Sequence, residues 1–186
     1  MQASRSVRFC SLFIFSLALL FASCAANPVG QKIKEPFSGS KYESTNRYYR
    51  ATGKGTSKMD AVATSQAEMR ARQNLAQQVQ TYFEVVTDDY QKSTTGQLLD
   101  EAMTRFETLA REITSTKLAD MRQIGNEKYQ GEDGSYTVYV AIEIKKASMY
   151  RQLKKQARLD SKIKASELDE INALLDQLIE QAESEE

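Results

Sequence analysis

Tyr136-Thr-Val-Tyr-Val-Ala-Ile-Glu-Ile-Lys145 is the stretch that decides the fold of this 186-residue chain. β-Branched and aromatic residues dominate it, and every second side chain from Tyr136 to Ile144 is aromatic or aliphatic. Alternate residues of a strand share a face, so the pattern predicts a strand with one buried side. The turn sequence Gly131-Glu-Asp-Gly134 comes before it, and 116–130 reads as a less regular strand with Gly125 as a possible bulge. This order predicts a β-hairpin.

Upstream of the hairpin, the sequence predicts another strand and a long helix. The stretch Arg47-Tyr-Tyr-Arg-Ala-Thr-Gly-Lys-Gly55 reads as a strand with a glycine-rich exit, after which Thr56 or Ser57 can cap a helix. That helix is expected over 58–86, and its small alanines would let it lie close to a sheet. The expected inward positions are Ala63, Ala67, Arg70 or Ala71, Leu75, Val79, Tyr82 or Phe83, and Val86.

Two more segments have helical patterns. A polar, turn-like stretch over 87–96 leads into a second helix over 97–114. The segment 146–183 is helical and heavily charged, with a break near Asp160-Ser161. The predicted fold class is therefore α+β, in the order β-α-α-β-β-α. A small antiparallel or mixed three-stranded sheet is packed by two helices and followed by a long charged C-terminal helix.

Four apolar residues near the C-terminus form a possible partner-binding seam. Their spacing is that of a coiled-coil seam, over fewer heptads than a coiled coil needs. Two interpretations stay open: the helix packs back on its own domain, or the seam serves self-association or capture of a partner. The four residues are Leu168, Ile171, Leu175 and Leu178.

The N-terminal residues 1–23 read as an export signal. Arg5 and Arg8 supply a basic start, an uncharged apolar stretch follows over 9–22, and small residues surround Cys24. The stretch is short for a membrane span, which needs roughly 20 apolar residues. Phe21-Ala-Ser-Cys24 resembles the lipobox of bacterial lipoproteins, where the cysteine receives diacylglycerol; Phe21 stands where leucine is commonest. The alternative is an ordinary signal cut near Ala26.

The expected organisation after the signal has three parts. Residues 24–46 hold both prolines and read as a tether, 47–145 form the α+β domain, and 146–186 form a helical extension. The mature chain has a net charge near −2, because Arg5 and Arg8 leave with the signal. This near-balance argues against a nucleic-acid partner.

Several of these segments together resemble a known family. They are Ala51-Thr-Gly-Lys-Gly55, the Ala/Arg-rich helix over 67–76 and the strand over 136–141, in addition to the lipobox. The chain is similar over roughly 48–144 to the LPP-twenty lipoprotein family, whose relatives include flagellar outer-membrane lipoproteins and accessory domains. The resemblance implies an α+β domain, an outer-membrane location and a non-enzymatic envelope role, with no catalytic residues to carry over.

The residue inventory also argues against an enzyme. The chain has no histidine, which removes Ser-His and Cys-His pairs and the commonest zinc ligand. Gly53-Lys-Gly-Thr-Ser-Lys58 fails the phosphate-loop spacing because Tyr48 stands where the first glycine belongs. Asp88-Asp89 lacks the spacing of a calcium loop. No cofactor or metal is expected, only a covalent lipid on Cys24.

The sequence thus predicts a non-catalytic outer-membrane lipoprotein, facing the periplasm or the exterior, with a structural, assembly or protein-binding role. Its expected partners are the membrane, through the lipid, and other envelope proteins or copies of itself. The alternative is a soluble exported binding or effector protein; a histidine-free glycosidase using two carboxylates is weaker. The nine tyrosines, among them Tyr48, Tyr49, Tyr136 and Tyr139 on predicted strands, suit either a binding surface or the wet face of a sheet.

Overall fold

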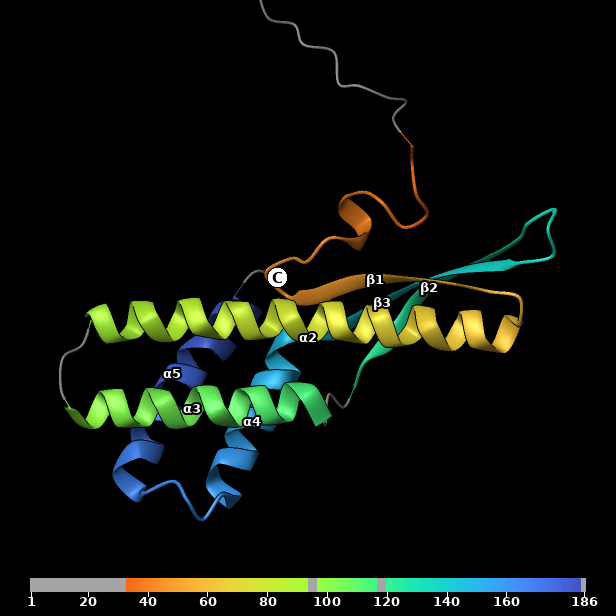
Figure 1. The fold of residues 1–186 in the computed structure, drawn as a ribbon. Helices are drawn as coiled ribbons and strands as arrows, with labels where there is room; N and C mark the ends of the chain where they lie inside the picture. Colours follow the sequence, from red (N-terminus) through yellow and green to blue (C-terminus); the bar gives the residue numbers. More distant parts are fainter. Residues whose placement is uncertain (1–32, 94–96, 117–119, 185–186) are drawn as a thin grey trace, which may run out of the picture. The chain divides into compact units, whose positions relative to one another are not determined.

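The computed structural model of the protein describes residues 33–93, 97–116 and 120–184, and residues from Lys34 onward form one compact unit. Three strands and four α-helices make up this unit, together with one turn of 3-10 helix (Figure 1). In chain order they are η1 (Ser40–Tyr42), β1 (Tyr48–Ser57), α2 (Asp60–Ser93), α3 (Gln97–Thr116), β2 (Arg122–Gln130), β3 (Tyr136–Lys145), α4 (Lys146–Leu159) and α5 (Ala165–Glu183).

The strands form one antiparallel sheet in the order β1-β3-β2, which confirms the predicted α+β class. The strand that the sequence marks most clearly, β3, is the central one. Its alternation puts Val138, Val140 and Ile144 on one buried face. The register between β2 and β3 shifts between Gln123 and Gly125, so the bulge predicted at Gly125 is present.

Helix α2 lies unusually close to β1 because neither backbone carries a side chain larger than methyl at the contact. A Cβ on Gly53 would lie 2.1 Å from the carbonyl oxygen of Ala67, and a Cβ on Gly55 would lie 2.0 Å from that of Ala63. Real Cβ atoms do not approach so closely, so only glycine fits at these two positions. The alanines of α2 that face the sheet are fully buried: Ala63, Ala67 and Ala71.

The same helix protects the free edge of β1. The guanidinium of Arg70 donates to the carbonyl oxygen of Lys54 at 2.8 Å, and the side-chain amide of Asn74 donates to that of Thr52 at 2.9 Å. An unpaired strand edge is a template for unwanted pairing, so these bonds also block aggregation along β1.

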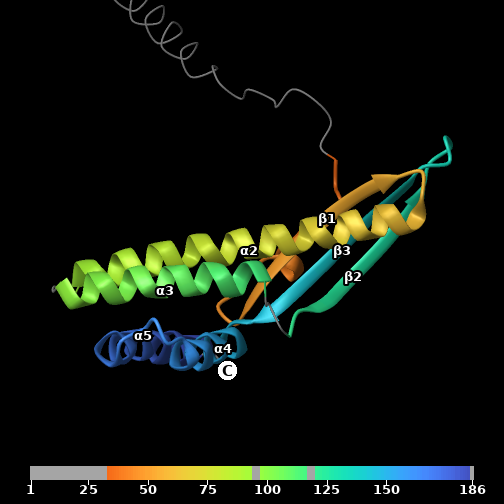
Figure 2. The ribbon, with the colours of Figure 1, turned by 60° about the horizontal axis from the view of Figure 1, so that its bottom comes forward.

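Among the described helices, α2 packs most extensively on the sheet, against β1 and β3, and α4 contacts the end of β3. Figures 1 and 2 show α2 running past the end of the sheet, where α3 returns antiparallel beside it and α4 and α5 pack below. The rings of Phe83, Phe106 and Tyr150 meet edge to face in this cluster, with Phe83 5.2 Å from Phe106 and 5.9 Å from Tyr150. Sheet and helices share one continuous core.

Helix α2 also continues through residues that the sequence marks as a turn. It ends at Ser93, so the prediction of a polar turn from Thr87 is wrong for 87–93. Thr87 is fully buried, and its hydroxyl lies 2.9 Å from the carbonyl oxygen of Phe83 and 2.5 Å from a carboxylate oxygen of Glu107 on α3. Packing against α3 therefore overrides the local turn preference.

The charged C-terminal segment folds into two helices, with the break beginning at Asp160, as the sequence predicts. The long charged C-terminal helix of the predicted fold is therefore divided at this break into α4 and α5, which pack against each other. Ile171, Leu175 and Leu178 are buried in the common core, and Leu168 packs against it. Their seam serves internal packing, the first of the two interpretations.

The close contact between α2 and β1 generates the first prediction. Gly53→Ala or Gly55→Ala forces α2 away from the sheet, so each change should lower the free energy of unfolding by about 3 kcal/mol or more. Urea titration followed by circular dichroism measures it. Thr56→Ser, at an exposed position of the same strand, keeps the hydroxyl that meets Thr137 and should change the value by less than about 0.5 kcal/mol. Gly-to-Ala variants as stable as the parent would contradict the contact.

Candidate functional site

The segment 34–46 is not a free tether but part of the folded unit, which corrects this part of the tether predicted over 24–46; residues 24–32 lie outside the described residues. It crosses the face of the sheet opposite α2, and Figure 1 shows it above β1. The amide of Thr45 donates to the carbonyl oxygen of Tyr48 at 2.9 Å, and the amide of Arg50 donates to the hydroxyl of Ser44 at 2.9 Å. The segment 34–46 is thus available to form part of a site on the sheet.

Phe37 fixes this segment to the sheet. Its ring lies on Gly125, where a Cβ would come within 2.5 Å of the ring atom Cε1, and it packs 5.0 Å from the ring of Tyr42. Phe37 has a φ of 59°, a left-handed conformation that is unfavourable for a bulky side chain. Such strain persists only where surrounding contacts hold it, and it is concentrated at functional sites.

Between this segment and the sheet lies a groove with a cavity volume of about 720 Å³. The other cavities described reach only about 290 Å³. The strands supply the floor and the segment 34–42 supplies one wall. The side chains that line the groove include Glu35, Phe37, Lys54, Glu127, Tyr129 and Tyr139.

Tyrosine rings and charged groups alternate across the floor of the groove. The rings of Tyr129 and Tyr139 meet edge to face, 6.0 Å apart. The ammonium of Lys54 lies 5.2 Å from the centre of the Tyr139 ring and 3.2 Å from a carboxylate oxygen of Glu35. These contacts with Tyr139 and Glu35 raise the pKa of Lys54, which stays charged.

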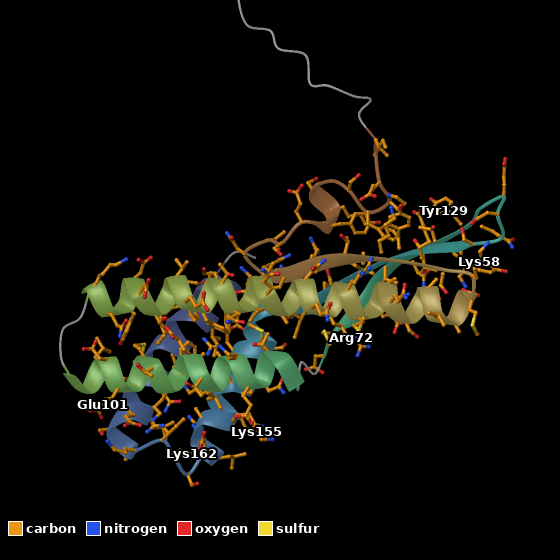
Figure 3. The ribbon with its side chains drawn as sticks, in the orientation of Figure 1. Lys58, Arg72, Glu101, Tyr129, Lys155 and Lys162 are labelled. Carbon is orange, nitrogen blue, oxygen red and sulfur yellow. The ribbon has the colours of Figure 1, made fainter. Side chains whose placement is uncertain are left out.

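Tyr129 is the most exposed ring in the groove. It is 50% exposed, and its hydroxyl donates to the carboxylate of Glu127. This hydrogen bond raises the pKa of Tyr129, so the phenol is neutral at physiological pH. Figure 3 shows Tyr129 on the hairpin, on the same side of the sheet as the segment 34–46.

A buried carboxylate holds the three strands together on the sheet face that carries the groove. Glu143 on β3 stands opposite Arg50 on β1 and Arg122 on β2, and its side chain is 3% exposed. The Arg50 Nε lies 2.8 Å from one carboxylate oxygen, and the Arg122 Nε lies 2.6 Å from the other. Burial acts to raise the pKa of Glu143, but the two guanidinium groups outweigh it and hold that pKa below its usual value.

The residues predicted to be functional do not meet at one site. Cys24 lies outside the described residues, and three of the four seam residues are buried in the core. Among the strand tyrosines, Tyr139 lines the groove, whereas Tyr49 is buried, with its hydroxyl 3.1 Å from that of Tyr150. Sequence reasoning missed Phe37 and Tyr129. Glu127 and Tyr129 are two residues apart and so share one face of their strand. This spacing could have indicated Tyr129 as part of a site.

Within the described ranges, no cluster of three or more acidic or cysteine side chains could hold a metal ion. None of the helices in these ranges is long and apolar enough to cross a membrane. Neither a family model, nor a curated protein, nor a solved structure matches the chain. Function is therefore inferred from the chain's own residues.

The buried carboxylate generates the second prediction. Glu143→Gln should lower the free energy of unfolding at pH 7 by about 2 kcal/mol, because two charged hydrogen bonds lose their acceptor charge. The lowered pKa means that the wild-type contribution is complete above the ordinary value of 4.5 and is lost as pH falls through the folded-state pKa. The difference between the two proteins should therefore shrink below pH 4.5.

Urea titrations at several pH values measure this difference. Glu132→Gln, in the exposed hairpin turn, is the control and should follow the wild type throughout. A Glu143→Gln deficit that stays constant down to low pH would show that the charge of Glu143 does not stabilise the sheet.

Proposed function

We propose that this chain is a lipid-anchored protein of the bacterial outer membrane with a non-catalytic binding or structural role in the envelope. The observation that carries the binding role is the groove, which is preformed and lined by half-exposed aromatic and charged side chains. Binding sites typically combine such concavity with a few positioned polar groups. The Cys24 motif and the resemblance to LPP-twenty lipoproteins support the location.

The groove is close to the anchor along the chain. Nine residues separate Cys24 from Lys34, where the folded unit begins. The ten Cα-to-Cα steps from Cys24 to Lys34 reach at most about 33 Å when fully extended, at about 3.3 Å per step. A lipid on Cys24 would therefore keep the groove within a few tens of ångströms of the bilayer.

The groove is better suited to binding than to catalysis. Both of its acids already have partners within the protein, Glu35 in an ion pair with Lys54 and Glu127 in a hydrogen bond from Tyr129. The chain has no histidine to act as a base near neutral pH. With the seam residues turned into the core, the groove is also the better surface for a partner.

The proposed lipid anchor generates the third prediction. The chain has two cysteines, so Cys10 provides a matched control for Cys24. When the full chain is expressed in a Gram-negative host, the mature protein should carry an N-terminal diacylglyceryl cysteine and sediment with the outer membrane. Cys24→Ser should abolish the lipid and release the protein from the membrane. Cys10→Ser, within the apolar stretch of the signal, should leave both unchanged. Intact-mass spectrometry and membrane fractionation measure these outcomes.

An unmodified N-terminus near Ala25 to Asn27 in the wild type would overturn the proposed anchor. That result would support instead a soluble exported protein released by ordinary signal cleavage.

A further inference from the structure

We infer that the groove binds an uncharged oligosaccharide, with the glycan strands of the cell wall as the polymer it would meet in the envelope. The inference deepens the proposed binding role and rests on it. Three properties of the groove indicate the chemistry of its ligand: the charge balance, the aromatic rings and the mixture of hydrogen-bond donors and acceptors.

The charge balance excludes strongly ionic ligands. Two lysines and two glutamates line the groove, so its formal charge is zero. Lys54 and Glu35 neutralise each other across the groove at 3.2 Å. A phosphorylated or polyacidic ligand would meet Glu35 and Glu127, and a polycationic ligand would meet Lys34 and Lys54, with repulsion and desolvation in each case. A neutral ligand avoids both costs.

The rings suit a ligand that is apolar on one side and polar at its margin. A tyrosine presents a flat apolar ring with a hydroxyl at its end, and Tyr129 is 50% exposed. A sugar ring has the complementary form, with C–H groups on its faces and hydroxyls around its edge. Tyr129 on the floor and Phe37 on the wall thus offer apolar surface to successive units of a chain.

The polar groups distinguish a saccharide from a proline-rich peptide, the other ligand that aromatic grooves favour. A proline-rich backbone offers mainly carbonyl acceptors, because proline has no N–H. The groove presents acceptors as well as donors: Glu35 and Glu127 accept with the oxygen lone pairs that their internal partners leave, and Lys34 donates. Sugar hydroxyls both donate and accept, so they can satisfy the whole set.

The groove is held in shape before a ligand arrives. Phe37 is locked against Gly125, Lys54 is held between Tyr139 and Glu35, and Tyr129 is oriented by Glu127. Little ordering remains to be done on binding, which favours weakly interacting ligands such as sugars.

The test uses the full-length protein in detergent and two probes that share chains of N-acetylated sugars, the second of which also carries charged peptides. Isothermal calorimetry with the tetramer of N-acetylglucosamine measures binding of the soluble form. Co-sedimentation with purified peptidoglycan sacculi measures binding of the polymer. We expect both, with Tyr129→Ala weakening the affinity roughly tenfold, and Tyr129→Phe, which keeps the ring, weakening it less.

Tyr48→Ala is the matched control, because Tyr48 lies on the same sheet face but does not line the groove. Circular dichroism checks that each variant is folded; if Tyr129→Ala is not, Glu127→Gln takes its place with the same expected loss. Binding of the tetramer without the sacculi would restrict the ligand to soluble saccharides and overturn the wall assignment.

No binding of either probe, or equal loss in Tyr48→Ala and Tyr129→Ala, would overturn the inference. Groove-dependent binding of a proline-rich decapeptide in place of the sugars would also overturn it, while keeping the groove as the binding site. The lipid on Cys24 is measured separately, so failure of the sugar assays is distinguishable from failure of the proposed anchor.

Discussion

The structure depends on a backbone-to-backbone contact between β1 and α2. Gly53 and Gly55 have no side chains, and the facing helix presents alanines. The backbones of strand and helix are therefore so close that a Cβ atom on either glycine would overlap a carbonyl oxygen of α2. This closeness lets Arg70 and Asn74 reach over the edge of β1 and occupy its free carbonyl groups. It also directs a 34-residue helix past the sheet, where α3, α4 and α5 complete the core.

Because the four described α-helices lie on one side or beyond the end of the sheet, the opposite face is left to the N-terminal segment with its turn of 3-10 helix. That face would otherwise expose a row of charges, and it is organised by Glu143 between Arg50 and Arg122. The segment 34–46 covers part of it and leaves a groove at the hairpin end, beside Tyr129 and Tyr139. The wall and the floor of the proposed site thus come from one arrangement: the strained Phe37 in the segment 34–46 and the polar face of the sheet.

The sequence predicts the elements whose signals are local. The alternation over 136–145, the turn before it and the bulge at Gly125 each specify their structure within a few residues, and all three are present. Thr87 is different, because its burial depends on Glu107, twenty residues away. The same holds for the candidate site. A proline-containing segment with little periodicity reads as a tether. Its packing on the sheet becomes visible only in the structure, where the Phe37 ring fills the space that a side chain on Gly125 would occupy.

The groove exists only if the segment 34–46 closes over the sheet, and the contact that closes it is the packing of Phe37 on Gly125. Nuclear Overhauser measurements on the isotopically labelled protein detect this contact. We expect cross-peaks between the Phe37 ring protons and the Gly125 α-protons, together with a ring-current shift of those α-protons. Phe37 signals at random-coil positions, without cross-peaks to β2, would contradict it.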